Sequence, residues 1–277
     1  MSHFSVGVFT DGKTSLEDLL IRYCEDIDYV PSIYLTFSDE TENLKKKLVE
    51  GTTKCINMSG TYYLIGSEEA EVCYENSSKL KEGCVIEEVP LNKLYNTIDE
   101  LAKYYDYTWN EEKGCWGYWY NPEAKWDWYS EGGRFADSLF SISEDDYVDS
   151  AEVRDIDFDR MLADSKESRK RHYEKLRAYY ENLPAEQKEV GLGEYYKGII
   201  ESYPTAEEYA NAKASAFSTY AVITPDGVWH APGEVGFWGM STDTEEESKK
   251  WYEEYTDRFL KEAKEKNWCL TIIDCHI

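Results

Sequence analysis

Several features that would place a protein in a common class are missing from these 277 residues. No stretch approaches roughly 18 apolar residues, and the opening MSHFSVGVFTDGK lacks a basic region followed by an apolar run. The seven cysteines are scattered and include no C-x-x-C pair, so they indicate neither a disulfide framework nor a thiolate zinc site. We therefore expect a cytoplasmic protein that needs no membrane, metal or cofactor.

Common catalytic signatures are missing as well. The sequence contains no G-x-x-x-x-G-K-[ST], no G-x-S-x-G, no H-E-x-x-H and no dinucleotide fingerprint. The common nucleotide hydrolase and serine hydrolase classes are thus unsupported.

Basic residues are scarce relative to acidic ones. The chain has 30 Lys and Arg against 56 Asp and Glu, a formal net charge of -26. This field repels nucleic acid phosphates and anionic membranes, so direct binding to DNA or RNA is disfavoured. It would attract a partner with a basic surface, whereas the simpler interpretation is that the charge keeps the protein soluble.

Aromatic residues are abundant instead. The 24 Tyr, 9 Trp and 9 Phe supply enough apolar area to close a core at this charge, so we expect a folded chain. Tyrosine also suits recognition surfaces, because it gives contact area for little lost rotamer entropy.

The two ends of the chain have the clearest secondary-structure patterns. They predict a strand at His3–Thr10, a helix after Ser15, a hairpin of Ser218–Thr224 with Val228–His230, a helix at Thr244–Lys266 and a strand at Leu270–Ile277. We expect an α+β fold, a ferredoxin-like or split sandwich whose antiparallel sheet joins both ends. Residues 1–37 and 217–277 would form this core.

The middle of the chain would then be inserted. We expect residues 38–142 to form an insertion that carries the aromatic segment, and residues 143–216 to form an acidic loop and a helical lobe. The predicted elements are helices at Thr41–Lys54, Leu91–Tyr105, Lys166–Asn182 and Glu207–Ala216, and strands at Thr61–Ile65 and Glu71–Tyr74. The segment from Ser143 to Asp159 contains eight carboxylates and one arginine, which indicates a solvated loop or a contact face.

The densest feature is the aromatic segment, Gly114 to Tyr129, followed by Glu131-Gly132-Gly133-Arg134-Phe135. Its N-P-E-A-K-W-D-W-Y and G-G-R-F stretches resemble a family of uncharacterised bacterial and phage proteins. The resemblance extends to Glu234–Gly239 and to the closing LTIIDCHI. It implies no established reaction, but the phage members imply an accessory role in conflict between phage and host.

The aromatic segment is the best candidate for a ligand or partner site. Clustered Trp and Tyr next to glycines can form an open stacking platform, and Arg134 could bind a phosphate or carboxylate bidentately. The candidate binding residues are Trp116, Trp119, Lys125, Trp126, Asp127, Trp128, Arg134 and Trp238. The alternative is structural, with Trp126 and Trp128 packed on the sheet inside a lattice of ion pairs.

A second candidate lies at the end of the chain. Asp274 and His276 fall on one face of the predicted last strand, because strand side chains alternate with a period of two. With Asp127 and with His230 or His3 they could bind a metal or form an acid/base pair, although a hydrogen-bonded strand end is the simpler interpretation.

Three functions remain open. The first is a stoichiometric inhibitor of a host defence protein, which would form a complex or self-associate through its acidic and aromatic surface. The second is a nucleotide-type binding protein or a hydrolytic enzyme that uses Trp126 to Arg134 with Asp274 and His276. The third is a purely structural role for the tryptophan segment.

Overall fold

The chain forms two compact units, residues 1–30 with 123–277, and residues 31–122. The computed structural model describes residues 3–76, 78–234 and 242–277. The boundary between the units falls between Pro122 and Glu123, inside the aromatic segment, whereas we expected the insertion to continue to residue 142.

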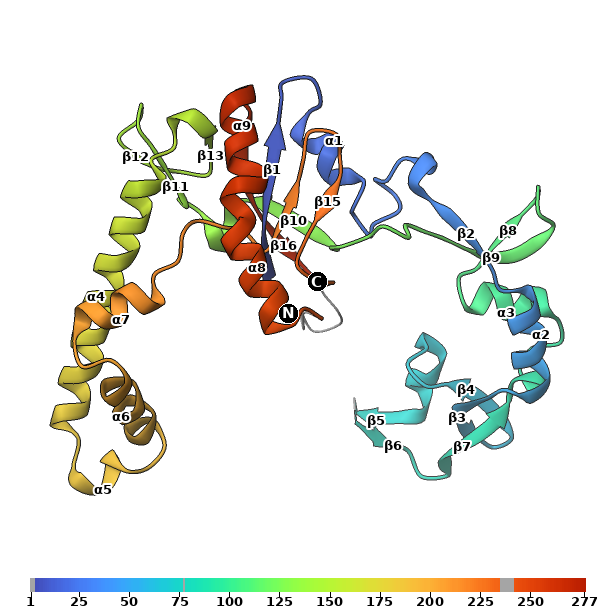
Figure 1. Cartoon of the computed structure of the whole chain (residues 1–277). Helices are drawn as coiled ribbons and strands as arrows, with labels where there is room; N and C mark the ends of the chain where they lie inside the picture. The colour runs from blue at the N-terminus through green and yellow to red at the C-terminus, as the bar shows by residue number, and fades with distance from the viewer. Residues whose placement is uncertain (1–2, 77, 235–241) are drawn as a thin grey trace. The chain divides into compact units, whose positions relative to one another are not determined.

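The first unit is built on a sheet in which the two ends of the chain pair (Figure 1). The strand order is β10–β16–β1–β14–β15, and β13 also pairs with β16. The strands are β1 (His3–Thr10), β10 (Trp128–Glu131), β13 (Ser150–Glu152), β14 (Ala221–Ile223), β15 (Trp229–His230) and β16 (Cys269–His276). All pairs are antiparallel except β1 with β14. The α+β class and the pairing of the terminal strands are thus confirmed.

One face of this sheet is covered by a helix near the end of the chain. It runs through α8 (Glu245–Tyr255), a π-helical turn (Thr256–Leu260) and α9 (Lys261–Lys266), as the predicted helix does. Thr244 and Glu247 form a capping box at its start, which satisfies backbone N–H groups that the first turn leaves free. Its aromatic side chains, spaced by four residues, pack against Phe9 and Ile272 of the sheet.

The opposite face carries α1 (Leu16–Ile21) and aromatic side chains. Ser15 caps the helix, since its side chain accepts from the Asp18 N–H. Trp126 is 2 % exposed and lies 5.9 Å, ring to ring, from both Tyr23 and Trp229. Trp126 is therefore a core residue.

The acidic segment forms ordered elements and leads into the helical lobe. Asp155 accepts from the Ser141 and Ser143 hydroxyls at 2.8 and 2.6 Å, which ties its turn to the preceding hairpin. The hairpin is β11 (Leu139–Ser141) with β12 (Asp146–Val148), and the helices are α4 (Phe158–Asn182), α5 (Ala185–Lys188), α6 (Leu192–Ser202) and α7 (Ala206–Lys213).

The second unit contains small antiparallel sheets and two helices. Its elements are β2 (Thr36–Asp39), α2 (Thr41–Glu50), β3 (Thr52–Met58), β4 (Thr61–Leu64), β5 (Tyr74–Asn76), β6 (Lys79–Leu80), β7 (Cys84–Pro90), α3 (Ile98–Tyr104), β8 (Thr108–Asn110) and β9 (Cys115–Tyr120). Parts of three predicted elements were wrong here. The helix predicted at Thr41–Lys54 ends at Glu50, because the chain is extended from Gly51 and forms β3 from Thr52. The segment Leu91–Tyr105 is not one helix, because Thr97 caps a new helix at Ile98, and Glu71–Cys73 belongs to a 3₁₀ helix.

Candidate functional site

Two histidines and two aspartates meet at one end of the main sheet. His3 is the first residue of β1 and pairs directly with His276 of β16, while Trp128 of β10 pairs with His276 on its other side. Directly paired residues of antiparallel strands point to the same face. The register therefore places all three side chains on the face that α8 and α9 cover further along the sheet.

Each histidine is held at Nδ1 by its own carboxylate. The His3 Nδ1 lies 2.8 Å from Asp274 Oδ1, and the His276 Nδ1 lies 2.7 and 3.0 Å from the two oxygens of Asp127. Asp274 and His276 are 2 % and 6 % exposed. A carboxylate at Nδ1 fixes the ring orientation and favours the tautomer whose Nε2 is free to accept a proton.

The Nε2 atom of His276 is buried and has no hydrogen-bond partner among the described residues. Its ring stacks on Trp128 at a centroid distance of 4.9 Å and an interplanar angle of 16°. The His3 ring meets it edge-on at 5.0 Å. Leaving a buried polar atom unpaired costs about 1–3 kcal/mol, so this nitrogen calls for a functional explanation.

A glycine turn brings the aromatic segment to the same cluster. Gly133 has φ +54°, a backbone conformation that residues with a side chain rarely adopt. A Cβ at this position would also lie only 2.5 Å from Asp274 Oδ2. The Arg134 N–H donates to that Oδ2 at 2.9 Å. In the part of the chain that the structure describes, no carboxylate pairs with the exposed Arg134 guanidinium.

The predicted candidates are divided between this cluster and other places. The structure brings together Asp127, Trp128, Arg134, Asp274 and His276. His230 lies elsewhere, with its Nε2 3.3 Å from the Thr224 hydroxyl.

The remaining aromatic candidates do not contribute to the cluster. Trp126 is buried on the other side of the sheet, as the structural alternative expected, and the Lys125 ammonium pairs with Glu234 at 2.6 Å. Trp116 and Trp119 belong to β9 in the second unit. Trp238 lies outside the described residues.

Sequence reasoning named His3 only as one of two partners for the last strand. The register of β1 with β16 decides between them, since it sets His3 opposite His276. The sequence indicated that the first and last predicted strands pair. The alternating residues alone could not show which residue of one strand lies opposite which residue of the other.

The cluster can perform proton transfer. Two imidazoles, each oriented by a carboxylate, are side chains of the kind that serve as general base and general acid. Among residues 3–76, 78–234 and 242–277, no group of three or more His, Cys, Asp and Glu side chains could hold a metal ion.

Comparisons with known proteins give no further guide. No protein-family model matches the chain, and neither the curated proteins nor the solved structures contain a significant match. None of the helices described here is both long and apolar enough to span a membrane.

Proposed function

We propose that this protein binds a nucleotide-like phosphate ester at the cluster of His3, Asp127, Trp128, Asp274 and His276 and transfers protons during its hydrolysis. The observation that carries the proposal is the buried Nε2 of His276, which lacks a partner while Asp127 holds the other ring nitrogen. A proton donor or acceptor on a bound ligand would satisfy this atom.

The chemistry follows from the two oriented imidazoles. In hydrolysis, one group takes a proton from the attacking water and another gives a proton to the leaving oxygen. His3 and His276 are adjacent and differ in their carboxylate partners, since Asp274 is buried and the Asp127 side chain is 46 % exposed.

The surroundings suit a ligand with a planar ring and an anionic group. Trp128 is 46 % exposed and offers part of an aromatic surface, and base stacking on such rings is worth about 1–3 kcal/mol. The Arg134 N–H donates to Asp274, and within the described residues no carboxylate pairs with its exposed guanidinium. Its planar fork suits a phosphate.

A binding assay tests the proposal. Thermal shift and tryptophan fluorescence across a panel of nucleotides should show one saturable ligand. His276→Asn keeps a polar group near the position of Nδ1 for Asp127 and removes Nε2, so it should weaken that ligand, as should Arg134→Gln. Arg177→Gln, which removes a surface ion pair with Glu181, should not. Absence of any ligand, or equal affinity in all four proteins, would refute the proposal.

A second candidate is the inhibitor of a host defence protein. The observation in its favour is a group of exposed aromatic side chains on one face of β8 and β9 of an acidic chain, Trp109, Tyr118 and Tyr120, which are 39–41 % exposed. Aromatic anchors of this kind are enriched at interfaces, and the charge would attract a basic partner surface.

Affinity purification of the tagged protein from host cells that carry defence systems tests the second candidate. The expected result is a stoichiometric partner that is lost in a Tyr118→Ala, Tyr120→Ala double variant. A partner retained by that variant would argue against this surface, and no partner at all would argue against inhibition.

The finer assignments from the sequence stay proposals. We propose that the protein belongs to the bacterial and phage family, lies in the cytoplasm, self-associates and does not bind nucleic acid directly. We also propose a ferredoxin-like or split sandwich fold. With β10, β13 and the helices of residues 158–213 set aside, the order β1, α1, β14, β15, α8 and α9, β16 matches the β-α-β-β-α-β succession. The parallel pairing of β1 with β14 distinguishes the observed sheet from an entirely antiparallel one.

A further inference from the structure

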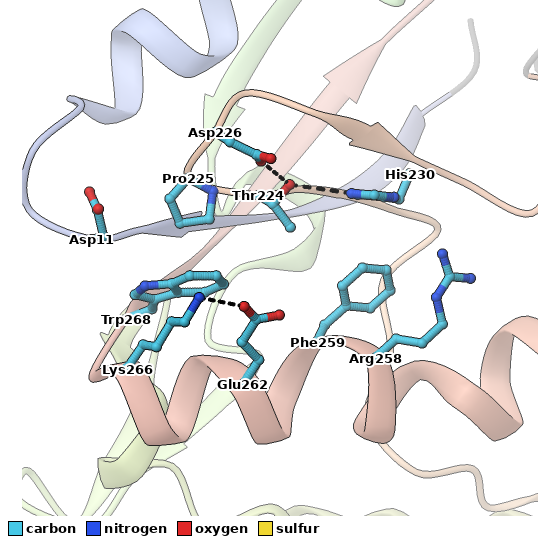
Figure 2. A pocket seen from close by; sticks show the side chains of 10 residues that line it. All are labelled: Asp11, Thr224, Pro225, Asp226, His230, Arg258, Phe259, Glu262, Lys266 and Trp268. Carbon is cyan, nitrogen blue, oxygen red and sulfur yellow. Dashed lines mark hydrogen bonds and ion pairs between the residues drawn. The ribbon is translucent and has the colours of Figure 1, made fainter.

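A separate cavity lies at the opposite end of β1 from His3. It has a volume of about 520 Å³, which is within the range of small-molecule pockets. Its lining residues are Asp11, Thr224, Pro225, Asp226, His230, Arg258, Phe259, Glu262, Lys266 and Trp268. Figure 2 shows two rows of side chains across it, one from the helix and Trp268 after it, and the other from the β14–β15 hairpin together with Asp11 after β1. This cavity shares no residue with the two-histidine cluster.

The helix side of the cavity is built by the π-helical turn. Thr256–Leu260 interrupts the α-helix between α8 and α9, and single π turns are frequent at functional sites. The turn contributes Arg258 and Phe259 to the lining. The Phe259 ring lies 5.3 Å from the His230 ring, so it connects the helix to the strand side.

Glu262, Lys266 and Asp11 have ion-pair partners, whereas Arg258 and the Asp226 carboxylate have none among the described residues. Glu262 pairs with Lys266 at 2.6 Å, and Asp11 pairs with Lys13 at 2.8 Å. Within the described residues, the Arg258 guanidinium makes no ion pair and lies over aromatic rings instead. An arginine with five donors and no carboxylate can bind an oxyanion.

The hairpin side adds polar groups at the same end. The Thr224 hydroxyl donates to Asp226 at 2.6 Å and lies 3.3 Å from the His230 Nε2. Figure 2 shows the Arg258 guanidinium rising toward His230, whereas Trp268 lies beneath Pro225 at the other end. One end of the cavity thus holds Arg258, His230 and the hydrogen-bonded Thr224 and Asp226, and the other end holds Trp268.

We propose that this cavity binds a small molecule in which an oxyanion, phosphate or carboxylate, is attached to a planar ring. The oxyanion binds Arg258 and His230, and the ring packs against Trp268. The ligand site is independent of the proposed proton-transfer site, because the two lie at opposite ends of the eight-residue strand β1.

Calorimetric titration of the full-length protein tests this site with two probes, adenosine monophosphate for the phosphate and indole-3-acetate for the carboxylate. One probe should bind saturably, and its identity shows which oxyanion the cavity takes. Arg258→Gln should weaken it about tenfold or more, since a charge-assisted contact is lost. Arg258→Lys keeps the charge without the fork and should fall between.

The controls separate this site from the other one. Thermal denaturation shows whether each variant is folded. If Arg258→Gln does not fold, the comparison of the wild type with Arg258→Lys still tests the role of the arginine. His276→Asn and Arg134→Gln should leave the affinity of the probe unchanged. Binding of neither probe, undiminished affinity in a folded Arg258→Gln, or loss of binding in His276→Asn alone would overturn the assignment.

Discussion

Trp126 offers the most direct test of how the aromatic segment contributes to the fold. The side chain is 2 % exposed and is surrounded by the rings of Tyr23, Tyr129 and Trp229 at 5.9 to 6.3 Å. Removing a large buried aromatic side chain costs about 3–5 kcal/mol through lost burial and the cavity left behind. Since a whole domain is stable by only about 5–15 kcal/mol, Trp126→Ala should come close to unfolding the first unit.

The indole nitrogen refines this magnitude. Trp126 Nε1 is buried without a hydrogen-bond partner among the described residues, and such an atom costs about 1–3 kcal/mol in the folded state. Trp126→Ala removes this cost too, so the net loss should lie near about 3 kcal/mol. Trp126→Phe keeps an aromatic ring and removes the nitrogen, so its loss should be within about 1 kcal/mol.

Urea unfolding followed by far-UV circular dichroism measures these differences, and calorimetry separates the transitions if the two units unfold independently. The control is Tyr252→Ala on α8, because this side chain is 53 % exposed and its loss should change stability by no more than about 0.5 kcal/mol. If Trp126→Ala were no more destabilising than Tyr252→Ala, the assignment of Trp126 to the core would be refuted.

Three further changes have definite expected outcomes. Burial, followed by the charge of Arg258, lowers the pKa of His230 below its usual 6.5, so the unfolded chain binds the proton more tightly. The unfolding free energy should therefore fall as pH decreases below about 6.5, and His230→Gln should reduce this slope in urea titrations at several pH values; an unchanged slope would contradict the cause. Gly133→Ala should displace Asp274 and abolish ligand binding in the fluorescence assay, whereas retained binding would mean that the turn tolerates a side chain. Thr244→Ala removes the capping box of α8 and should cost about 1 kcal/mol in thermal denaturation, and no loss would show that the cap is dispensable.

The ends of the chain could be predicted because their patterns are local. Alternating apolar residues identified β1 and β16, the Pro225-Asp226-Gly227 turn identified the hairpin, and aromatic residues spaced by four identified the helix after Thr244. Each of these signals depends on neighbours in the sequence. The α+β class followed from their order.

The aromatic segment could not be read in the same way. Trp126 and Trp128 are two residues apart, so an unbroken strand would place both side chains on the same face of the sheet. Strand β10 begins only at Trp128, and Trp126 turns into the core beside Tyr23. The division at Pro122 is hidden for a similar reason, since tryptophan and tyrosine occur on both sides of it.

The candidate site depended on pairing over long sequence distances. The contact of His276 with Asp127 spans 149 positions, and that of His3 with Asp274 spans 271. Residue types suggested Asp127, Asp274 and His276 as candidates, but strand register decided which histidine joined them. The cavity at Arg258 had no signal in the sequence, because Tyr255, Phe259 and Ala263 remain four residues apart through the π-helical turn.

The most direct test of the central claim is turnover. The wild-type protein and His276→Asn are incubated separately with the same nucleotide panel, and the products are identified by mass spectrometry. The account predicts that the wild type hydrolyses at least one nucleotide and that the folded variant loses this activity. An unchanged panel with the wild type, or equal turnover by both proteins, would contradict the role of His276 in proton transfer.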